Sequence, residues 1–274
     1  MIHIATVHWQ SDRWIDVQLR YLQRHLSGPW RAYAALGEIE GDFSERFQVT
    51  IPGEGSHADN LNRLAERIVA EADPGDTLVF LDGDAFPIAP FDEPLRSLLA
   101  RSPLAAVRRD ENLGDRQPHP SFCVTTAGFW SEIGGDWSKG PQWRNAEGAM
   151  VTDVGARLLE ALEQRRIEWT PILRTNVRDL HPVLFGVYGD LVYHHGAAFR
   201  IAFSRRDELE VERAVAELDG NRYERTQLYL DLKREKSAEN ERLAARVLER
   251  IASDEDFART LFMSDGEPLS RVLP

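Results

Sequence analysis

The N-terminal part of the chain alternates short apolar runs with longer stretches whose apolar residues recur every three or four positions. Short runs of this kind are typical of buried strands, and the longer stretches are typical of amphipathic helices. The predicted strands cover residues 2–7, 30–36, 47–51, 77–81, 104–108 and 121–126. Predicted helices separate most of them, so we expect an α/β fold with a mixed, mostly parallel central sheet.

The composition changes from Arg205 onward, where Glu, Lys, Arg, Leu and Ala dominate. Residues 207–218 and 223–251 contain no glycine or proline and are predicted to be helices. They carry an apolar stripe that packs either on the main domain or on a partner, for which a second copy of the chain is one candidate; the stripe consists of Leu243, Val247, Leu248 and Ile251. We therefore expect a main domain at 1–204 and a helical extension at 205–274.

The bulk properties exclude several classes of protein. A formal net charge of −12 argues against a sequence-independent nucleic-acid binder, which needs a basic face. Cys123 is the only cysteine, so an internal disulfide and a cysteine metal cluster are excluded, and we expect this side chain to be a small buried hydrophobe. The N-terminus lacks the pattern of a secretory signal, and no window is apolar enough to span a membrane, so a cytoplasmic location is the expectation.

The segment Asp82-Gly83-Asp84 follows the apolar run of residues 77–81 directly. Side chains alternate in extended chain, so both carboxylates are expected to project the same way beyond the strand. Two carboxylates this close repel unless a cation compensates them, which fits a hard divalent ion that carries a phosphate group. Gly83 leaves room for something to approach the backbone. The alternative is a tight Asp-Gly turn between two strands.

Ligands of α/β sheets bind beyond the carboxyl ends of the strands, where three loops of this chain converge. These loops are residues 6–12, 53–62 and 82–84. The candidate nucleotide-binding residues in them are Thr6, Val7, His8, His57, Asn62, Asp82, Gly83 and Asp84. For His57 and Asn62, the alternative is a role in starting the helix that follows residues 56–60.

Two adjacent histidines, His194 and His195, end a β-like run and precede a glycine. Neutral imidazole is a good ligand for divalent metals, which makes both candidate metal ligands together with Asp82 and Asp84. Neighbouring side chains of extended chain point opposite ways, so only one histidine is expected to face the site. A structural histidine is the alternative for either.

Three further features are candidates for substrate contacts. Asp153 opens a predicted helix and is either an ordinary first-turn carboxylate or a site carboxylate. The polar segment 109–120 has the composition of a mobile lid. Arg108, Arg109 and Arg116 could meet phosphate, and the commoner alternative is a solvated surface arginine. The region 128–148 contains tryptophans that either fill the core or stack on sugar rings, with core favoured for Trp130.

Together, these motifs resemble the GT-A-fold glycosyltransferases that use nucleotide sugars. The resemblance covers residues 1 to about 200 and rests on the buried strand that ends in Asp82-Gly83-Asp84, followed downstream by His195-Gly196 and Arg200 with His194 in front. It implies a Rossmann-like domain with a nucleotide-binding half at 1–90 and an acceptor and metal half at 91–204. It also implies a hexosyltransferase-like enzyme with Mn²⁺ or Mg²⁺ and a nucleoside-diphosphate sugar, with UDP favoured.

In that family the Asp-x-Asp motif holds the donor ribose and the metal ion, which implies ribose for Asp82, metal for Asp84, and His194 or His195 as the third ligand. Arg200 is then a candidate phosphate contact, and Asp153 is the base of an inverting reaction or positions the sugar of a retaining one. Tyr193 stands where retaining enzymes of the galactosyltransferase and glycogenin type have histidine, so the stereochemistry stays open. The alternatives are a nucleotidyltransferase that makes an activated sugar, although residues 7–12 lack its Gly-rich loop, and a non-catalytic nucleotide-sugar binding protein.

Overall fold

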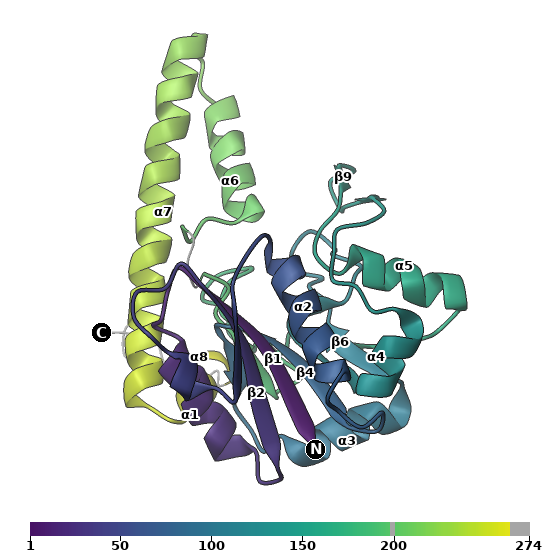
Figure 1. The fold of residues 1–274 in the computed structure, drawn as a ribbon. Coiled ribbons are helices and arrows are strands. Elements are labelled where there is room, and N and C mark those ends of the chain that lie inside the picture. The colour runs from purple at the N-terminus through teal and green to yellow at the C-terminus, as the bar shows by residue number, and fades with distance from the viewer. Residues whose placement is uncertain (198–200, 264–274) are drawn as a thin grey trace. The chain divides into compact units, whose positions relative to one another are not determined.

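A computed structural model describes residues 1–197 and 201–263 (Figure 1). The chain forms two compact units. The first unit consists of Met1–Thr175 and Val187–His194. The second consists of Asn176–Gly186 and the chain from His195 onward. The second unit thus contains the C-terminal helices expected at 205–274, but it begins ten residues earlier and takes in a separate loop.

The first unit is built on a seven-stranded sheet with the order β10-β6-β7-β4-β1-β2-β3. The sheet is mixed and mostly parallel, as the sequence predicts: β7 runs antiparallel to β4 and β6, and the other neighbours are parallel. Its strands are β1 (Ile2–Trp9), β2 (Trp30–Gly37), β3 (Val49–Pro52), β4 (Thr77–Asp82), β6 (Leu104–Val107), β7 (His119–Thr126) and β10 (Thr170–Ile172).

Five helices cover the two faces of this sheet (Figure 1). Leu78 and Phe80 of β4 pack in one core cluster, and Val79 and Leu81 pack in the other, because side chains of a strand alternate between faces. The first cluster includes α2 (His57–Val69), α4 (Ala127–Ile133) and α5 (Ala156–Arg165), and the second includes α1 (Ile15–His25) and α3 (Asp92–Arg101). A strand buried on both faces explains the unbroken apolar run that precedes Asp82.

The tryptophans of region 128–148 are interior residues. Trp130 and Trp137 belong to the cluster beneath α2, α4 and α5, and Trp143 is only 7% exposed. Trp130 therefore fills the core as expected, whereas stacking of these indoles on a sugar is wrong for this structure because their faces are covered. Cys123 is also fully buried, as expected, and burial raises the pKa of its thiol well above the usual value.

Two small sheets flank the large one. β12 (Val192–His194) pairs antiparallel with β5 (Ala85–Pro87), and their register sets His194 opposite Ala85. β11 (Gly186–Tyr188) completes that three-stranded sheet. The other is the ribbon of β8 (Trp143–Arg144) and β9 (Met150–Val151). The β5–β12 pairing brings a residue distant in sequence to the carboxyl end of β4.

Helix starts follow the predictions only in part. Ser56 caps α2 through a capping box with Asp59, as the alternative interpretation of residues 56–60 expects. α1 begins at Ile15 without a side-chain cap. α5 begins at Ala156 rather than at Thr152-Asp153, because Gly155 in left-handed conformation (φ 89°) separates Asp153 from the helix.

The second unit contains α6 (Arg205–Ala216), α7 (Arg222–Ser253) and α8 (Phe257–Phe262), and α6 packs on α7. The 32 residues of α7 extend for about 48 Å at the usual helical rise. Val247 and Ile251 of the predicted stripe are fully buried. His181 of the separate loop donates through Nε2 to the Asp207 carboxylate of α6 at 3.1 Å, and both side chains are buried.

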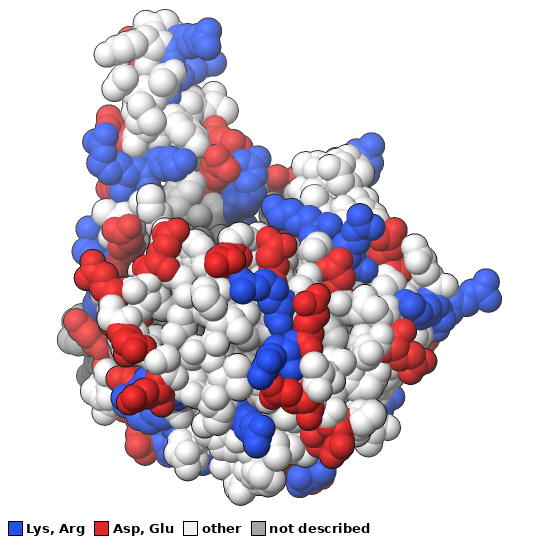
Figure 2. Space-filling model, in the orientation of Figure 1, with Lys and Arg blue, Asp and Glu red and all other residues white. Residues whose placement is uncertain are grey.

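Charges of both signs are interspersed on the face drawn in Figure 2, where basic side chains alternate with acidic ones. This distribution accompanies the formal net charge of −12. Among the described residues, no helix combines the length and the apolar character that a membrane span requires.

Candidate metal centre

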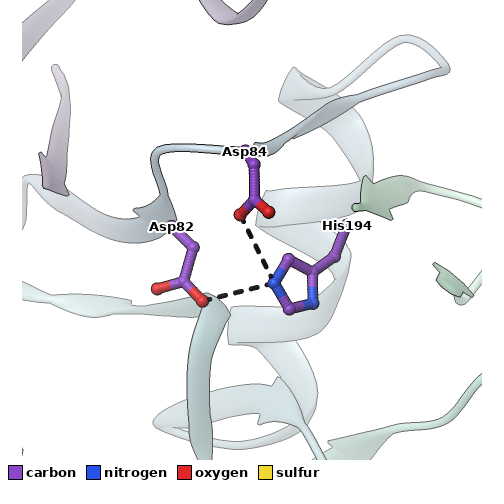
Figure 3. Close-up of side chains that lie close together, drawn as sticks. All are labelled: Asp82, Asp84 and His194. Atoms are coloured by element: carbon purple, nitrogen blue, oxygen red, sulfur yellow. Dashed lines mark ion pairs between the residues drawn. The ribbon is translucent and has the colours of Figure 1, made fainter. Parts of the chain in front are cut away.

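Asp82, Asp84 and His194 converge at the carboxyl end of β4 (Figure 3). Nε2 of His194 lies 3.5 Å from Oδ2 of Asp82 and 3.4 Å from Oδ1 of Asp84. One ligand atom from each of the three lies within 4.8 Å of the other two. The side chains are only 6–15% exposed, so water competes little for their charges. The three side chains could hold one divalent cation.

Gly83 allows the turn between the two aspartates to lie against β1. A Cβ at this position would be 2.5 Å from the carbonyl oxygen of Val7 and 2.8 Å from Nδ1 of His8. The backbone of Gly83 is not in the left-handed region, so the glycine is needed for space rather than for conformation. Gly83 therefore admits a close backbone approach, as the sequence predicts, and what approaches it is the neighbouring strand.

His57 contacts the candidate metal centre through Asp82. Its Nε2 lies 2.9 Å from Oδ1 of Asp82, at the start of α2. Burial lowers the pKa of His57, but the negative charges of Asp82, Asp84 and Asp153 raise it by more, so the net shift of the pKa is upward. These carboxylates therefore make protonation of His57 easier than that of an ordinary imidazole. His57 and His194 thus contact different oxygens of Asp82.

Gln18 of α1 contacts the backbone of the same turn. Its Nε2 donates to the carbonyl oxygens of Asp82 and Ala85, each at 2.8 Å, and its Oε1 lies 3.2 Å from Nε2 of His8. Burial lowers the pKa of His8 to about 4, against small opposing effects of Gln18 and Asp84, so the ring is neutral. The pattern of α1 contained a signal that sequence reasoning missed: a polar residue at a position facing the core, between Ile15 and Leu22.

Several predicted nucleotide-binding residues are enclosed in this structure. The side chains of Thr6, Val7 and His8 are 0%, 5% and 2% exposed, so they lie beneath the site rather than on its surface. Asn62 donates to Oδ1 of Asp136 at 2.7 Å and accepts from the Trp137 backbone at 2.9 Å. Burial leaves the side chains of Thr6, Val7 and His8 little surface for a ligand, whereas Asn62 is only partly buried, and a role of these residues in nucleotide binding stays a prediction.

Asp153 pairs with the buried Arg109, which also pairs with the buried Asp115. Nη2 of Arg109 donates to Asp115 at 2.7 Å and to Asp153 at 2.9 Å, and the Asp153 side chain is 41% exposed. Burial raises the pKa of Asp115, although Arg109 opposes the shift. Asp153 contributes to raising the pKa of His57, so its charge acts on the metal centre. It is an accessible carboxylate held in place by an arginine.

The segment expected to be a mobile lid is tied down at several points. Beyond the Arg109 pairs, Glu111 accepts from the Tyr188 hydroxyl at 2.6 Å, and the carbonyl oxygen of Leu113 accepts from the Ala146 backbone at 2.8 Å. Arg109 is 9% exposed. The sequence offered Arg109 as a phosphate contact or as a solvated surface arginine, because nothing in the pattern shows that both of its acidic partners lie close in space.

His195 and Arg200 do not add to the described site. His195 is 2% exposed and packs edge-on against Phe185, with 4.9 Å between ring centroids. Among the described residues, the metal-ligating group contains His194 and not its neighbour. Arg200 lies outside the described residues.

The ends of β1 and β2 carry a second feature absent from the predictions. Gln10 and Glu38 follow these strands, both in left-handed conformation with φ of 56° and 51°. Their side chains are hydrogen-bonded to each other. Left-handed conformation of residues other than glycine is uncommon and concentrates near functional sites. Their position at the carboxyl edge places this strained pair on the side of the sheet that carries the candidate metal centre.

No protein-family model matches the chain. No curated protein sequence matches it either. Among solved structures, S. aureus TarS is similar at 7% identity over 84% of this chain, with a TM-score of 0.42. A structure of TarS 1–349 is similar at 9% identity over 94% of this chain and 89% of the other, with a TM-score of 0.41. The galactosyltransferase LgtC, solved with donor and acceptor sugar analogues, is similar at 10% identity over 47% of this chain and 59% of the other, with a TM-score of 0.33.

The chain spans 42% of the length of TarS, the first of these. Further similar structures include the bifunctional glycosyltransferase WbbM and the glycosyltransferase GlyE from Streptococcus pneumoniae. All five TM-scores lie below 0.5. The function proposed below therefore rests on the residues of the site itself.

Proposed function

We propose that this chain is a metal-dependent glycosyltransferase, which moves a sugar from a nucleoside-diphosphate sugar to an acceptor hydroxyl. The observation that carries the proposal is the convergence of Asp82, Asp84 and His194. They lie at the carboxyl edge of a mostly parallel sheet, where folds of this kind bind their ligands. An Asp-x-Asp segment at this place is also the feature on which the resemblance to GT-A glycosyltransferases rests.

The donor atoms of the group fit Mn²⁺ well. Carboxylate oxygens suit Mg²⁺, Ca²⁺ and Mn²⁺, whereas imidazole nitrogen suits transition metals. Two carboxylates and one imidazole therefore favour Mn²⁺ over Mg²⁺. When bound, such an ion supplies Lewis-acid compensation for the charge that develops on the diphosphate as it leaves. The chain's own contribution is to hold the three ligand side chains close together before the substrate arrives.

The residues around the metal centre have separable tasks in this proposal. Asp84 and His194 are metal ligands, and Asp82 serves the metal and the donor ribose. His57 orients the Asp82 carboxylate through its 2.9 Å contact. A histidine that contacts a ligating carboxylate in this way fixes the geometry of that ligand and raises metal affinity.

Asp153 is the candidate group on the acceptor side. For an inverting reaction it accepts the proton of the acceptor hydroxyl as a general base, and for a retaining reaction it positions the sugar. Arg109 holds its Oδ2 at 2.9 Å, and the backbone N–H of Val154 donates to its Oδ1 at 2.9 Å. Two contacts on a partly exposed carboxylate fix its direction while leaving part of it open to substrate.

Replacing Asp84 by asparagine tests the metal centre at nearly constant volume. We expect Mn²⁺-dependent hydrolysis or transfer from a panel of nucleoside-diphosphate sugars to fall by about 100-fold or more, because loss of a direct ligand exceeds the usual cost of losing an outer partner. Release of the nucleoside diphosphate is the measurement. Asp219→Asn, which changes an exposed aspartate of the second unit, is the matched control and keeps wild-type activity.

Equal activity of wild type and Asp84→Asn contradicts the proposal. Two other outcomes identify the alternatives. Pyrophosphate release from a nucleoside triphosphate and a sugar phosphate identifies a nucleotidyltransferase. Tight Mn²⁺-dependent binding of nucleotide sugar without turnover, across many acceptors, identifies a nucleotide-sugar binding protein.

A further inference from the structure

Gln18 is a fully buried polar residue on the face of α1 that packs against the sheet. The carbonyl oxygens that accept from its Nε2 belong to Asp82 and Ala85. These carbonyls stand on either side of Gly83-Asp84. One side-chain amide therefore joins the two ends of the turn that carries both candidate metal-ligating carboxylates.

The orientation of this amide follows from its partners. Only the nitrogen of a side-chain amide can donate to carbonyl oxygens, so Nε2 faces the turn and Oε1 faces His8. The ring nitrogen 3.2 Å from Oε1, Nε2 of His8, must then carry the proton of the neutral ring. An inverted amide would set its oxygen against two carbonyl oxygens. His8 thus selects the one orientation in which Gln18 can hold the turn.

We propose that Gln18, oriented by His8, is a positioning residue that holds the Asp82–Ala85 turn in the shape that binds the metal ion. This inference rests on the proposed function, because it requires the metal centre. Neither residue belongs to the ligand group of Asp82, Asp84 and His194. Both act through the backbone of the turn rather than through its carboxylates.

The turn needs such support because two carboxylates in neighbouring positions repel each other in the absence of a cation. A ligand group that is already assembled loses less conformational freedom on binding the ion than a group that must first close. Two hydrogen bonds from a fully buried side-chain amide to backbone carbonyls oppose opening of the turn. Gly83 assists because a Cβ at this position would lie only 2.5 Å from the carbonyl oxygen of Val7 in β1.

The affinity of the full chain for Mn²⁺ alone tests this proposal. Binding is measured by calorimetry and by the electron paramagnetic resonance signal of free Mn²⁺, and the melting temperature of each variant is recorded without metal. Gln18→Met keeps the size of the side chain and removes its hydrogen bonds. His8→Leu and His8→Gln form a matched pair, in which only glutamine keeps a donor near the place of Nε2. Leu22→Ala, also fully buried in α1, is the control for general destabilisation.

Wild type is expected to bind Mn²⁺ in a manner that Asp84→Asn abolishes, which establishes the metal centre. Gln18→Met is then expected to weaken Mn²⁺ binding about 10- to 100-fold, the range found for outer partners of metal ligands. His8→Leu is expected to weaken Mn²⁺ binding as well. The Mn²⁺ affinities of His8→Gln and Leu22→Ala are expected to stay within about twofold of wild type, because both variants keep the hydrogen bonds from Gln18 to the turn. Leu22→Ala nevertheless lowers the melting temperature.

Wild-type affinity of a folded Gln18→Met variant overturns the proposal while leaving the metal centre in place. If Gln18→Met does not fold, the His8 pair decides, and equal affinities of His8→Leu and His8→Gln overturn it. A loss of Mn²⁺ affinity in Leu22→Ala as large as in Gln18→Met also overturns it, because the effect is then one of stability alone. Absence of Asp84-dependent binding in wild type overturns this inference and the proposed function together.

Discussion

At the scale of single residues, burial decides which polar side chains can meet a ligand. His8 and His194 look equivalent in the sequence, because both end an apolar run at a predicted site edge. His194 reaches two carboxylates, whereas His8 turns inward to Gln18. The difference lies in what surrounds each ring. His8 is enclosed without a carboxylate in direct contact, so the desolvation of its charged form dominates and its pKa falls to about 4.

This lowered pKa predicts a specific loss of stability in acid. Above the ordinary pKa of 6.5 the ring is neutral in the folded and unfolded states, so the contribution is fully present. As the pH falls from 6.5 towards 4, His8 binds a proton in the unfolded state but not in the folded state, so the free energy of unfolding falls. Between pH 7 and 4.5 the free energy of unfolding should fall by roughly 2–3 kcal/mol more in wild type than in His8→Gln, measured by urea denaturation. Parallel pH profiles of the two proteins would contradict this assignment.

At the scale of elements, the site is made by the close approach of strand ends rather than by any one loop. β1 lies beside β4 with Val7 opposite Asp82, and β12 lies beside β5 with His194 opposite Ala85. The first pairing places the Asp82–Ala85 turn against the backbone of β1. The second places His194 close to the two carboxylates. Both pairings are registers between distant segments, so a shift of either by one residue would reverse the side chain's direction and remove a ligand.

A Cβ at Gly83 should disrupt the first of these contacts. Gly83→Ala would set a methyl group 2.5 Å from the Val7 carbonyl oxygen, which belongs to a central strand and cannot move cheaply. We expect a loss of stability of about 1–3 kcal/mol, typical of overpacking, together with weaker Mn²⁺ binding. Denaturant unfolding measures the first effect and calorimetry the second.

Gly75→Ala is the matched control for this substitution. Nothing lies within 4 Å of a Cβ there, and the backbone of Gly75 is outside the left-handed region. It should be neutral or slightly stabilising, since alanine restricts the unfolded chain. Equal stabilities of Gly83→Ala and Gly75→Ala would show that β1 shifts to make room for a methyl group at position 83.

At the scale of the whole molecule, the formal charge of −12 works against binding of a nucleoside diphosphate, which is itself an anion. A bound divalent cation cancels the formal charge of the two carboxylates and can itself contact the diphosphate. The proposed function therefore requires that the diphosphate and the metal ion bind together. Equally strong binding of the nucleotide without a metal ion would instead require a basic surface at the site.

A thermal-shift screen of nucleoside diphosphates, with and without Mn²⁺, tests this requirement and names the base. At about 100 times its dissociation constant, the preferred diphosphate together with Mn²⁺ should stabilise the protein by about 2.7 kcal/mol. No comparable shift is expected without Mn²⁺ or in Asp84→Asn. UDP is the diphosphate that the family resemblance favours, and a shift that does not depend on Mn²⁺ would contradict the coupling.

The sequence by itself determined the local features of this protein. The apolar run before Asp82 predicted a strand buried on both faces, the glycine between the aspartates predicted a close approach, and the uninterrupted charged stretches after Arg205 predicted long helices. Each follows from interactions within a few residues. Periodicity and the special properties of glycine act over short distances, so they can be recognised without the fold.

Only the tertiary structure decided which distant residues meet. The structure brings His194 close to Asp82 and Asp84 and places Gln18 against the backbone of the Asp82–Ala85 turn. It also buries Thr6 and Val7 and pairs Arg109 with Asp153. Each of these outcomes depends on strand register or on the packing of a helix against the sheet. Such contacts are selected by the free energy of the whole core, which is spread over residues far apart in the chain, and no short pattern contains it.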